Sequence, residues 1–365
     1  MYDLKNLGWN DHFQNQHERN TRLDQRQGAQ PPLAARVIAE HRGGRYELLT
    51  EAGALHGVAP GRWRHHKPDR EQWPAVGDWV EVDPPEQGDE VLLRRVLSRQ
   101  SSLMRRASGE RTEAQVLGAN LDLVFVVVAV GADFSPRRVE RYLTTIWESG
   151  ARPAVILSKV DLVEDHWPLV ARLEAVAGGV PVLPVSGVSP GGLSPLRRHL
   201  GPGQTVALVG SSGVGKSTIT NSLLGEEVQA VKTIRESDET GRHTTTGRHL
   251  FVLPNDQGLL MDTPGMRELQ LWDGQEALDQ TFKDVEELAQ RCRFTNCTHD
   301  TEPGCAIHAA VERGELTWGR VHSYQKLQRE AAYQERRRND AAARLERKKW
   351  KKLSKHMRRF DNGKR

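Results

Sequence analysis

The stretch TVALVGSSGVGKST at residues 205–218 decides the fold, because it joins an apolar run to a phosphate-binding loop. Its second part matches the pattern G-x-x-x-x-G-K-[ST], and a helical stretch ending near Gly225 follows it. A strand, a glycine-rich loop and a helix in this order are the context that the motif requires. Gly213 and Gly215 allow backbone N–H groups to turn towards phosphates at a helix N-terminus, where the dipole favours anions.

The side chains of this loop predict a nucleotide held with a magnesium ion. Lys216 is expected to reach the β- and γ-phosphates and to contribute to catalysis, and Ser217 is expected to bind Mg²⁺. The residues predicted to contact the nucleotide here are Gly210, Ser211, Ser212, Gly213, Val214, Gly215, Lys216, Ser217 and Thr218.

A second motif, GLLMDTPGM at 258–266, reads as an apolar strand that ends at Asp262. A carboxylate in that place can hold the water shell of Mg²⁺. Gly265 lets a backbone N–H approach the γ-phosphate, since it has no side chain. Asp-x-Pro-Gly also forms ordinary turns, so the motif gains its weight from following a phosphate loop.

Between these motifs lies GRHTTTGRH at 241–249, which is polar and flanked by glycine. Such a composition is typical of a mobile loop that offers a threonine hydroxyl to Mg²⁺, as in the order–disorder switch of GTPases. Thr245 is the preferred candidate for this metal and catalytic role, with Thr244 and Thr246 as alternatives. A simple polar hairpin turn is the structural alternative.

The string LSKVDL at 157–162 favours guanine over adenine. Residues 154–157 read as a strand, and open α/β sheets bind ligands at the carboxyl ends of their strands. Asp161 can accept hydrogen bonds from the guanine N1–H and exocyclic amine, a donor pair that adenine lacks. Lys159 is expected to pack its stem over the base, with Val160 beside it. Ser158 stands where GTPases usually carry asparagine, which predicts weaker affinity with unchanged specificity.

PVSG at 184–187, after another apolar stretch, fits the remaining guanine loop. Ser186 is expected to present its backbone N–H to the oxygen of the base. The guanine motif therefore precedes the phosphate loop, and no second [NST]-K-x-D follows residue 262. One chain can build one site from motifs in any order, so the sequence predicts a circularly permuted GTPase.

All three cysteines of the chain lie in CRFTNCTHDTEPGC at 292–305. With His299 they give the spacing C-x₄-C-x-H-x₅-C, a set suited to tetrahedral zinc. An odd number of cysteines argues against a disulfide framework. Four protein ligands leave no open position, so one structural zinc ion is predicted, bound by Cys292, Cys297, His299 and Cys305.

The permuted motifs and the cysteine cluster together resemble the ribosome small-subunit-dependent GTPase A family, over roughly residues 31–320. These are bacterial circularly permuted GTPases of late small-subunit assembly. The resemblance implies a GTP hydrolase that binds GTP and GDP, contacts the small (30S) ribosomal subunit and its rRNA, and is stimulated by the subunit. Ser158 departs from the usual GTPase pattern. A factor that docks on the ribosome is expected to be a monomer.

Composition shifts along the 365 residues divide the chain further. The predicted fold is an α/β circularly permuted phosphate-loop GTPase with an N-terminal OB-fold-like β-barrel and a C-terminal helical zinc-binding domain. The barrel prediction rests on about five short strand-like pieces broken by Gly and Pro. The predicted segments are a polar, disordered tail (1–30), the barrel (31–112), the GTPase domain (113–280), the zinc-binding helical domain (281–335) and a basic tail (336–365).

Two basic segments predict contact with RNA. Residues 62–70 carry arginine, lysine and histidine near Trp63 and Trp73, which suits phosphate neutralisation and base stacking. Residues 336–365 hold fourteen Lys and Arg against three Asp and Glu, and such a surface releases counterions on binding phosphates. A solvated loop with structural tryptophans, and a solvated charge run, are the alternatives.

Other classes of protein fit less well. No apolar run approaches the ~20 residues that span a bilayer, and residues 1–30 lack the apolar core of a signal peptide. A cytoplasmic protein without membrane contact is therefore predicted. An ATPase or kinase would have no use for Asp161. An RNA-binding scaffold that senses guanine nucleotides without relevant turnover stays open as the alternative function.

The predicted hydrolysis mechanism has a gap. Ras-like enzymes orient the attacking water with a glutamine directly after the D-x-x-G motif, and here that position is Met266. His243, in the glycine-flanked loop, is the nearest candidate substitute, and a surface histidine is its structural alternative. Slow intrinsic hydrolysis is expected.

Overall fold

The computed structural model describes residues 2–61, 63, 72–106, 114–132, 134–225, 248–262, 275–299, 302–333 and 336. The chain divides into two compact units. Unit 1 comprises residues 1–105 and 113–270, and unit 2 comprises residues 106–112 and 271–365. Within the described ranges, no helix has the length and apolar character needed to cross a membrane.

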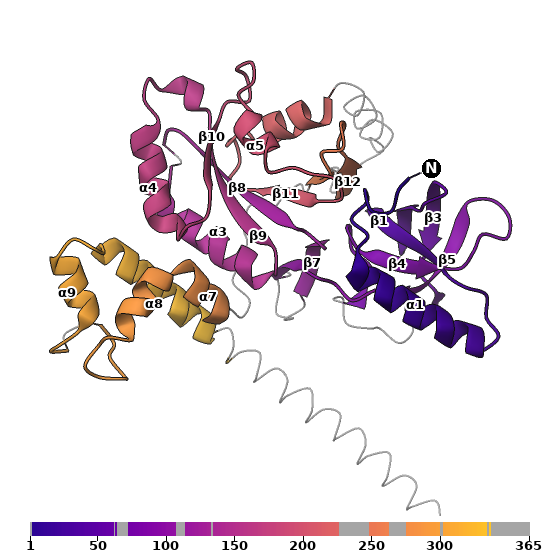
Figure 1. Ribbon diagram of the computed structural model, residues 1–365, viewed down its shortest axis with the longest axis horizontal. Helices are drawn as coiled ribbons and strands as arrows, with labels where there is room; N and C mark the ends of the chain where they lie inside the picture. Colours follow the sequence, from indigo (N-terminus) through magenta and orange to yellow (C-terminus); the bar gives the residue numbers. More distant parts are fainter. Residues whose placement is uncertain are drawn as a thin grey trace, which may run out of the picture. The chain divides into compact units, whose positions relative to one another are not determined.

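Unit 1 contains a sheet that runs in the order β10-β9-β8-β11-β13-β12 (Figure 1). Neighbouring strands from β10 to β13 are parallel, and only β12 is antiparallel to its neighbour β13. The first parallel strands are separated along the chain by helices, as expected for an α/β fold. The bounds are Leu123–Ala129 (β8), Arg152–Ser158 (β9), Val182–Val185 (β10), Thr205–Val209 (β11), His249–Val252 (β12) and Leu259–Asp262 (β13).

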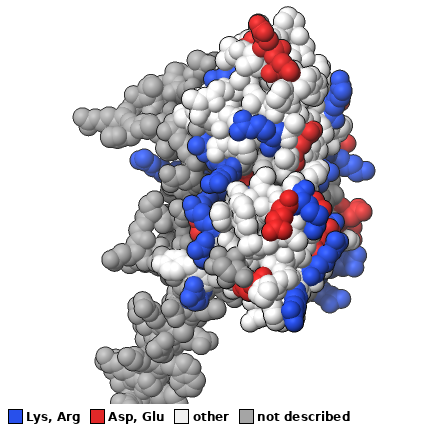
Figure 2. Space-filling view, turned by 90° about the vertical axis from the view of Figure 1, so that its left-hand side faces the viewer, with Lys and Arg blue, Asp and Glu red and all other residues white. Residues whose placement is uncertain are grey.

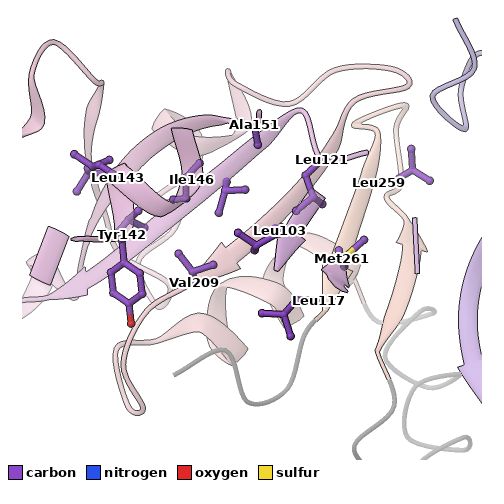
Figure 3. Packing of buried hydrophobic residues seen from close by; sticks show 14 of the residues in the cluster. Leu103, Leu117, Leu121, Tyr142, Leu143, Ile146, Ala151, Val209, Leu259 and Met261 are labelled. Carbon is purple, nitrogen blue, oxygen red and sulfur yellow. The ribbon is translucent and has the colours of Figure 1, made fainter. Parts of the chain in front are cut away.

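Both faces of this sheet are buried, which explains the continuous apolar sequence of β8. Val124 and Val126 point into one cluster with α3 (Pro136–Glu148) and α4 (Trp167–Ala177). Phe125 lies in the opposite cluster with α5 (Ser194–Arg197) and the helical residues 216–225. Figure 3 shows side chains of the first cluster, among them Tyr142, Leu143, Ile146, Val209 and Met261.

A closed barrel precedes this sheet and confirms the OB-like prediction. Its strands pair in the circuit β1-β2-β3-β5-β4, and β4 pairs back onto β1. The strand-like pieces predicted from the sequence, 35–38, 45–49, 77–82 and 90–97, overlap β1, β2, β4 and β5. Strand β3 was not among them, because its sequence ALHGV has a weak pattern. The bounds are Leu33–His41 (β1), Arg45–Leu49 (β2), Ala54–Val58 (β3), Trp79–Val82 (β4) and Glu90–Val96 (β5).

The barrel and the sheet are joined within unit 1 by strand β1. Ala39 of β1 is the register partner of His249 in β12, so the two sheets are continuous. Arg36, only 1% exposed, donates to the carbonyl oxygens of Leu7 (3.2 Å) and Asn120 (3.3 Å) and to the Thr205 hydroxyl (3.1 Å). Burial lowers the pKa of Arg36 to about 10, so its charge persists at neutral pH and must be matched by these acceptors.

The prediction of a disordered N-terminal tail was wrong. Residues 11–26 form helix α1 (Asp11–Arg26), capped by the Asn10 side chain. Phe13 is 1% exposed and packs near the Trp79 ring of the barrel. Asp24 pairs with Arg95 at 2.6 Å and Arg94 at 3.1 Å. The few apolar residues are too widely spaced to predict a helix alone, and contacts with the barrel supply the stability.

Unit 2 is helical around its own core. Helices α7 (Gln275–Thr281), α8 (Lys283–Ala289) and α9 (Ala306–Glu312) are followed by helical residues 318–333. Leu278 of α7 packs with this core, so the helical unit begins before the predicted boundary at 281. The residues of the predicted basic tail lie outside the described part of the chain, except Arg336.

A separate sheet of β6 (Ser102–Arg106) and β7 (Ala114–Ala119) follows the barrel strands.

Candidate nucleotide and metal sites

The phosphate loop packs tightly against the neighbouring strand. Gly210, Gly213 and Gly215 have φ values of 144°, 79° and 96°, which favour glycine. A Cβ atom on Gly210 would lie 2.4 Å from the Val127 carbonyl oxygen, so a side chain there would displace the loop from β8. A helix begins at residue 216. The N-terminus of this helix therefore adjoins the loop, and the positive end of the helix dipole there favours an anion.

Lys216 lies across this loop. Its Nζ donates to the carbonyl oxygens of Gly210 at 2.7 Å and Ser211 at 2.6 Å. A phosphate is a stronger, charge-assisted acceptor than a neutral carbonyl. The Lys216 ammonium could therefore exchange these two carbonyl oxygens for the oxygens of a bound phosphate. Ser217 and Thr218 are exposed at the start of the helix, where their hydroxyls are open to a metal ion or an anion.

Ser158 joins the guanine motif to the phosphate loop. It ends β9, is 2% exposed, and its hydroxyl donates to the Val214 carbonyl at 2.6 Å. The Val128 carbonyl lies 3.3 Å away. The serine thus bonds the loop itself, although the sequence predicted it as a reduced substitute for an amide contact. The hydrogen bond between Ser158 and Val214 therefore joins the guanine motif to the phosphate loop, although the two motifs lie about fifty residues apart and in permuted order.

The residues after Ser158 expose the carboxylate of Asp161, which the sequence predicts to bind guanine. Lys159 has φ 61° and ψ 34°, the left-handed region, and is followed by the 3₁₀ turn η2 (Val160–Leu162). A non-glycine residue adopts this conformation only where its surroundings compensate the strain. Asp161 lies in this turn and is exposed, so its carboxylate can meet a planar base at the carboxyl edge of the sheet.

The loop after β10 differs in detail from its prediction. The Ser186 N–H donates to the Gly192 carbonyl oxygen at 3.2 Å, so it is not presented to a base. Its hydroxyl accepts from the N–H of Ser189 at 3.0 Å. Among the described residues, the N–H of Gly187 has no protein acceptor. A Cβ on Gly187 would lie 2.9 Å from the Thr218 side chain, which places Gly187 beside the phosphate-loop helix and makes it the better donor.

Asp262 completes the described part of the site. It ends β13, which is parallel to β11, so both strands end at the same edge of the sheet. It is partly buried and lies opposite His249 in the register of β12. The structure therefore brings together residues 158–161, 210–218 and 262 along one edge. His243, Thr245, Gly265 and Met266 lie outside the described residues.

The opposite edge of the sheet holds a cavity of about 650 Å³. Arg152 and Arg198 line it, together with Gly178 at the end of α4. Cations at helix C-termini offset the negative end of the helix dipole. The helix ends therefore explain the two arginines, and no bound ligand is needed. The cavity lies at the amino ends of the strands, whereas the nucleotide motifs follow their carboxyl ends.

In unit 2 the predicted zinc ligands converge. The ligand atoms of Cys292, Cys297, His299 and Cys305 all lie within 4.8 Å of one another. Cys292 Sγ and Cys305 Sγ are 4.0 Å apart, and each lies 3.6 Å from His299 Nδ1. Zn–S and Zn–N bonds of roughly 2.3 and 2.0 Å in a tetrahedron require about 3.8 Å between sulfurs and about 3.5 Å from sulfur to nitrogen. The cluster fits a zinc ion.

The surroundings of the cluster shift the pKa values of two of its side chains. Burial, with hydrogen bonds to Cys305 and Cys292, raises the pKa of the Cys297 thiol to about 11. Burial also lowers the pKa of His299, which keeps its imidazole neutral and able to bind a metal. The N–H of Ala306 donates to Cys292 Sγ at 3.3 Å, a bond that supports a thiolate. The binding of a divalent cation would deprotonate these thiols.

Comparison with known protein families gives two matches. The family model described as RsgA GTPase matches residues 96–272. A model described as ABC transporter matches residues 193–360, and it overlaps the first across the phosphate loop, a motif that different nucleotide-binding proteins use.

Relatives that match along most of the chain are named as RsgA GTPases of small ribosomal subunit biogenesis. The small ribosomal subunit biogenesis GTPase RsgA 1 of Oceanobacillus iheyensis is 46% identical over 324 residues, which cover 88% of this chain and 92% of the relative. The RsgA protein of Opitutus terrae is 42% identical, covering 96% of this chain and 95% of its own.

Two solved structures share the fold. YjeQ from Thermotoga maritima has a TM-score of 0.61 at 26% identity and covers 82% of this chain and 99% of its own. YloQ, described as a circularly permuted GTPase, has a TM-score of 0.58 at 26% identity and covers 82% of this chain and 95% of its own. The permuted order inferred from the motifs is confirmed.

Proposed function

Because the chain belongs to the RsgA family of GTPases, we propose that it hydrolyses GTP during late maturation of the small ribosomal subunit. In this proposal the GTP form binds the subunit and its rRNA, and the subunit stimulates hydrolysis. The observation that carries the proposal is the meeting of the guanine motif and the phosphate loop at Ser158, in a chain whose near full-length relatives are named for small-subunit biogenesis. Such a role belongs in the cytoplasm, and a monomer suffices for it.

Magnesium is the proposed metal of the nucleotide site. The residues that would hold it are Ser217 at the helix start, Asp262 at the end of β13, and Thr245. The exposed Ser217 and the partly buried Asp262 are oxygen donors, which suit a hard cation. When bound with GTP, magnesium neutralises charge on the β- and γ-phosphates. Lys216 would contribute to the same neutralisation, and the zinc ion of unit 2 would be structural.

The water-positioning group is proposed to be His243. Met266 has no group that can orient water, and a histidine in the glycine-flanked 241–249 segment can donate or accept a hydrogen bond. Docking on the subunit would then order that segment. The alternative function is an RNA-binding scaffold that senses guanine nucleotides, and Met266 is the observation that favours it. A multiple-turnover phosphate-release assay with subunits separates the two.

The Ser158 hydroxyl should matter for nucleotide affinity. Ser158→Ala leaves the Val214 carbonyl without its 2.6 Å donor, and an unsatisfied buried acceptor costs about 1–3 kcal/mol. We expect GDP and GTP to bind about tenfold more weakly, measured by calorimetry. Ser189→Ala removes an exposed hydroxyl from the neighbouring loop and should bind like the parent. Equal affinity in both variants would remove Ser158 from the site.

The contact with rRNA is proposed to come from residues 62–70 and 336–365. Trp63 and Trp73 pack against the barrel core with their rings 6.2 Å apart, which supports a structural role for both tryptophans rather than base stacking. On the face shown in Figure 2, lysine and arginine side chains are interspersed with aspartate and glutamate. The basic tail holds eleven more cationic than anionic residues, whereas the whole chain has a formal net charge of +4, so residues 1–335 carry a net negative charge.

Deleting residues 336–365 should weaken subunit binding and its salt dependence. Fourteen cationic residues are lost, and each missing phosphate contact lowers the slope of log affinity against log salt by about 0.7–0.9. Intrinsic hydrolysis should persist, because no nucleotide motif is removed. A full-length variant with glutamine at the fourteen positions separates charge from length. Unchanged affinity and slope in both proteins would place the RNA contact elsewhere.

The proposed function is tested by nucleotide-dependent docking. The full chain is sedimented with purified small subunits in the presence of a non-hydrolysable GTP analogue, GDP or no nucleotide. We expect the GTP analogue to give the tightest binding, because a ligand can shift docking only through differential affinity for the two states. Equal binding under all three conditions would contradict the proposal.

A further inference from the structure

One arginine outside the recognised motifs reaches the phosphate loop. Arg138 Nη1 donates to the Ser211 hydroxyl at 2.6 Å, although the two residues are far apart in sequence. Arg138 lies in the first turn of α3, where its N–H donates to the Ser135 carbonyl at 3.1 Å. None of the nucleotide motifs includes this helix, so sequence reasoning had no signal for it.

The backbone of Arg138 is held firmly beside the loop. Val139 and Tyr142 of the same helix are buried in the core under β8, and β8 pairs with β11 up to Val209. The gap between the helix and the loop measures about 10 Å³ and is lined by Arg138, Ser211 and Val214 among others. That volume is at most enough for one water molecule, so the helix start and the loop pack directly together.

Two cations meet on Ser211. Lys216 Nζ donates to its carbonyl oxygen at 2.6 Å, and Arg138 donates to its hydroxyl at 2.6 Å. Lys216 is the group that reaches the β- and γ-phosphates in phosphate-loop enzymes. The Arg138 guanidinium is therefore separated from the phosphate subsite by one residue. A guanidinium has five donors in a planar fork, so it can hold Ser211 and a phosphate oxygen together.

We propose that Arg138 contacts the γ-phosphate of bound GTP and serves as an arginine supplied in cis for hydrolysis. The inference rests on the proposed function. In the reaction, a water oxygen bonds to the γ-phosphorus and the bond to the β–γ bridging oxygen breaks. GDP leaves with that electron pair, and the water proton goes to the phosphate product or to solvent. Arg138 exchanges no proton and stabilises the negative charge on the oxygens being transferred.

Hydrolysis by the full chain with small subunits tests the inference. Arg138→Ala should lower kcat by about 100-fold or more, with the Kd for GDP changed less than about threefold. Arg138→Lys should restore little of the rate, since an ammonium lacks the fork. Arg137→Ala removes the adjacent exposed arginine and is the matched control, with the rate of the parent expected. An unchanged kcat for Arg138→Ala would overturn the inference.

A binding measurement keeps the test independent of turnover. Arg138→Ala should weaken a non-hydrolysable GTP analogue and GDP–aluminium fluoride by about tenfold or more relative to GDP, in keeping with a charge-assisted contact to the terminal phosphate. An equal loss for all three ligands would mean that Arg138 only holds the loop, which also overturns the inference. If the parent fails to hydrolyse GTP with subunits while the selective loss remains, the proposed function fails and the contact stands.

Discussion

Asp161→Asn should exchange guanine preference for xanthine preference. In the proposed site the carboxylate of Asp161 would accept hydrogen bonds from the guanine N1–H and exocyclic amine, and an asparagine amide would replace one acceptor with a donor. Xanthine carries a carbonyl oxygen where guanine carries that amine, so the new donor finds an acceptor. Sites that hydrogen-bond a specific group discriminate by 10⁴ or more, and we expect GTP affinity to fall by about 10³-fold while XTP binding appears.

The Asp161→Asn substitution should not disturb the fold. Asp161 is exposed in the η2 turn, so the change leaves the packed core of unit 1 untouched. Glu164→Gln removes a nearby exposed carboxylate and should leave both affinities at parent values. Competition of GTP and XTP against a fluorescent guanine nucleotide measures the outcome. An Asp161→Asn protein that still prefers GTP would remove Asp161 from base recognition.

Cys297→Ser should unfold the region around residues 285–320 of unit 2 and leave unit 1 folded. Zinc-binding free energies of about 10–16 kcal/mol in such clusters are folding free energies. Cys292 and Cys297 pack against the unit 2 core, and Cys305 belongs to it, so the loss of one ligand frees the whole cluster. Hydrogen exchange should show lost protection around residues 285–320, with GDP binding unchanged because unit 1 has separate cores.

Metal analysis supplies the control for that result. The parent should contain about one zinc per chain, lose protection over the same residues when chelated, and regain it when zinc is returned. Cys297→Ser should not respond to added zinc. A parent that is folded over 285–320 with well under one zinc per chain would contradict the four-ligand assignment.

The parts of the site that the sequence predicted depend on short-range geometry. The phosphate loop needs glycine at fixed positions and a strand before it, and both are visible in residues 205–218. The four predicted zinc ligands lie within fourteen residues, so their spacing alone restricts the geometry. The permuted order could also be predicted, because each motif follows a strand and the carboxyl ends of parallel strands lie at the same edge of a sheet.

The parts that were missed depend on contacts between distant residues. Helix α1 is stabilised by the barrel, through Phe13 on Trp79 and Asp24 on Arg95, and its own sequence shows no helical pattern. Strand β3 contains Gly57, whose missing Cβ leaves room for the side chains of Leu48 and Leu93. Arg138 reaches the loop only through the packing of α3 on β8. None of these contacts has a local signature.

Multiple-turnover GTP hydrolysis, measured with and without purified small ribosomal subunits, tests whether the small subunit activates this GTPase. The intrinsic rate should be slow, because Met266 occupies the place of the water-orienting glutamine. Small subunits should raise kcat by about tenfold or more, by analogy with activation of GTPases that lack a complete site, and large subunits should not. The same rate with and without small subunits would contradict a GTPase whose turnover is coupled to small-subunit maturation.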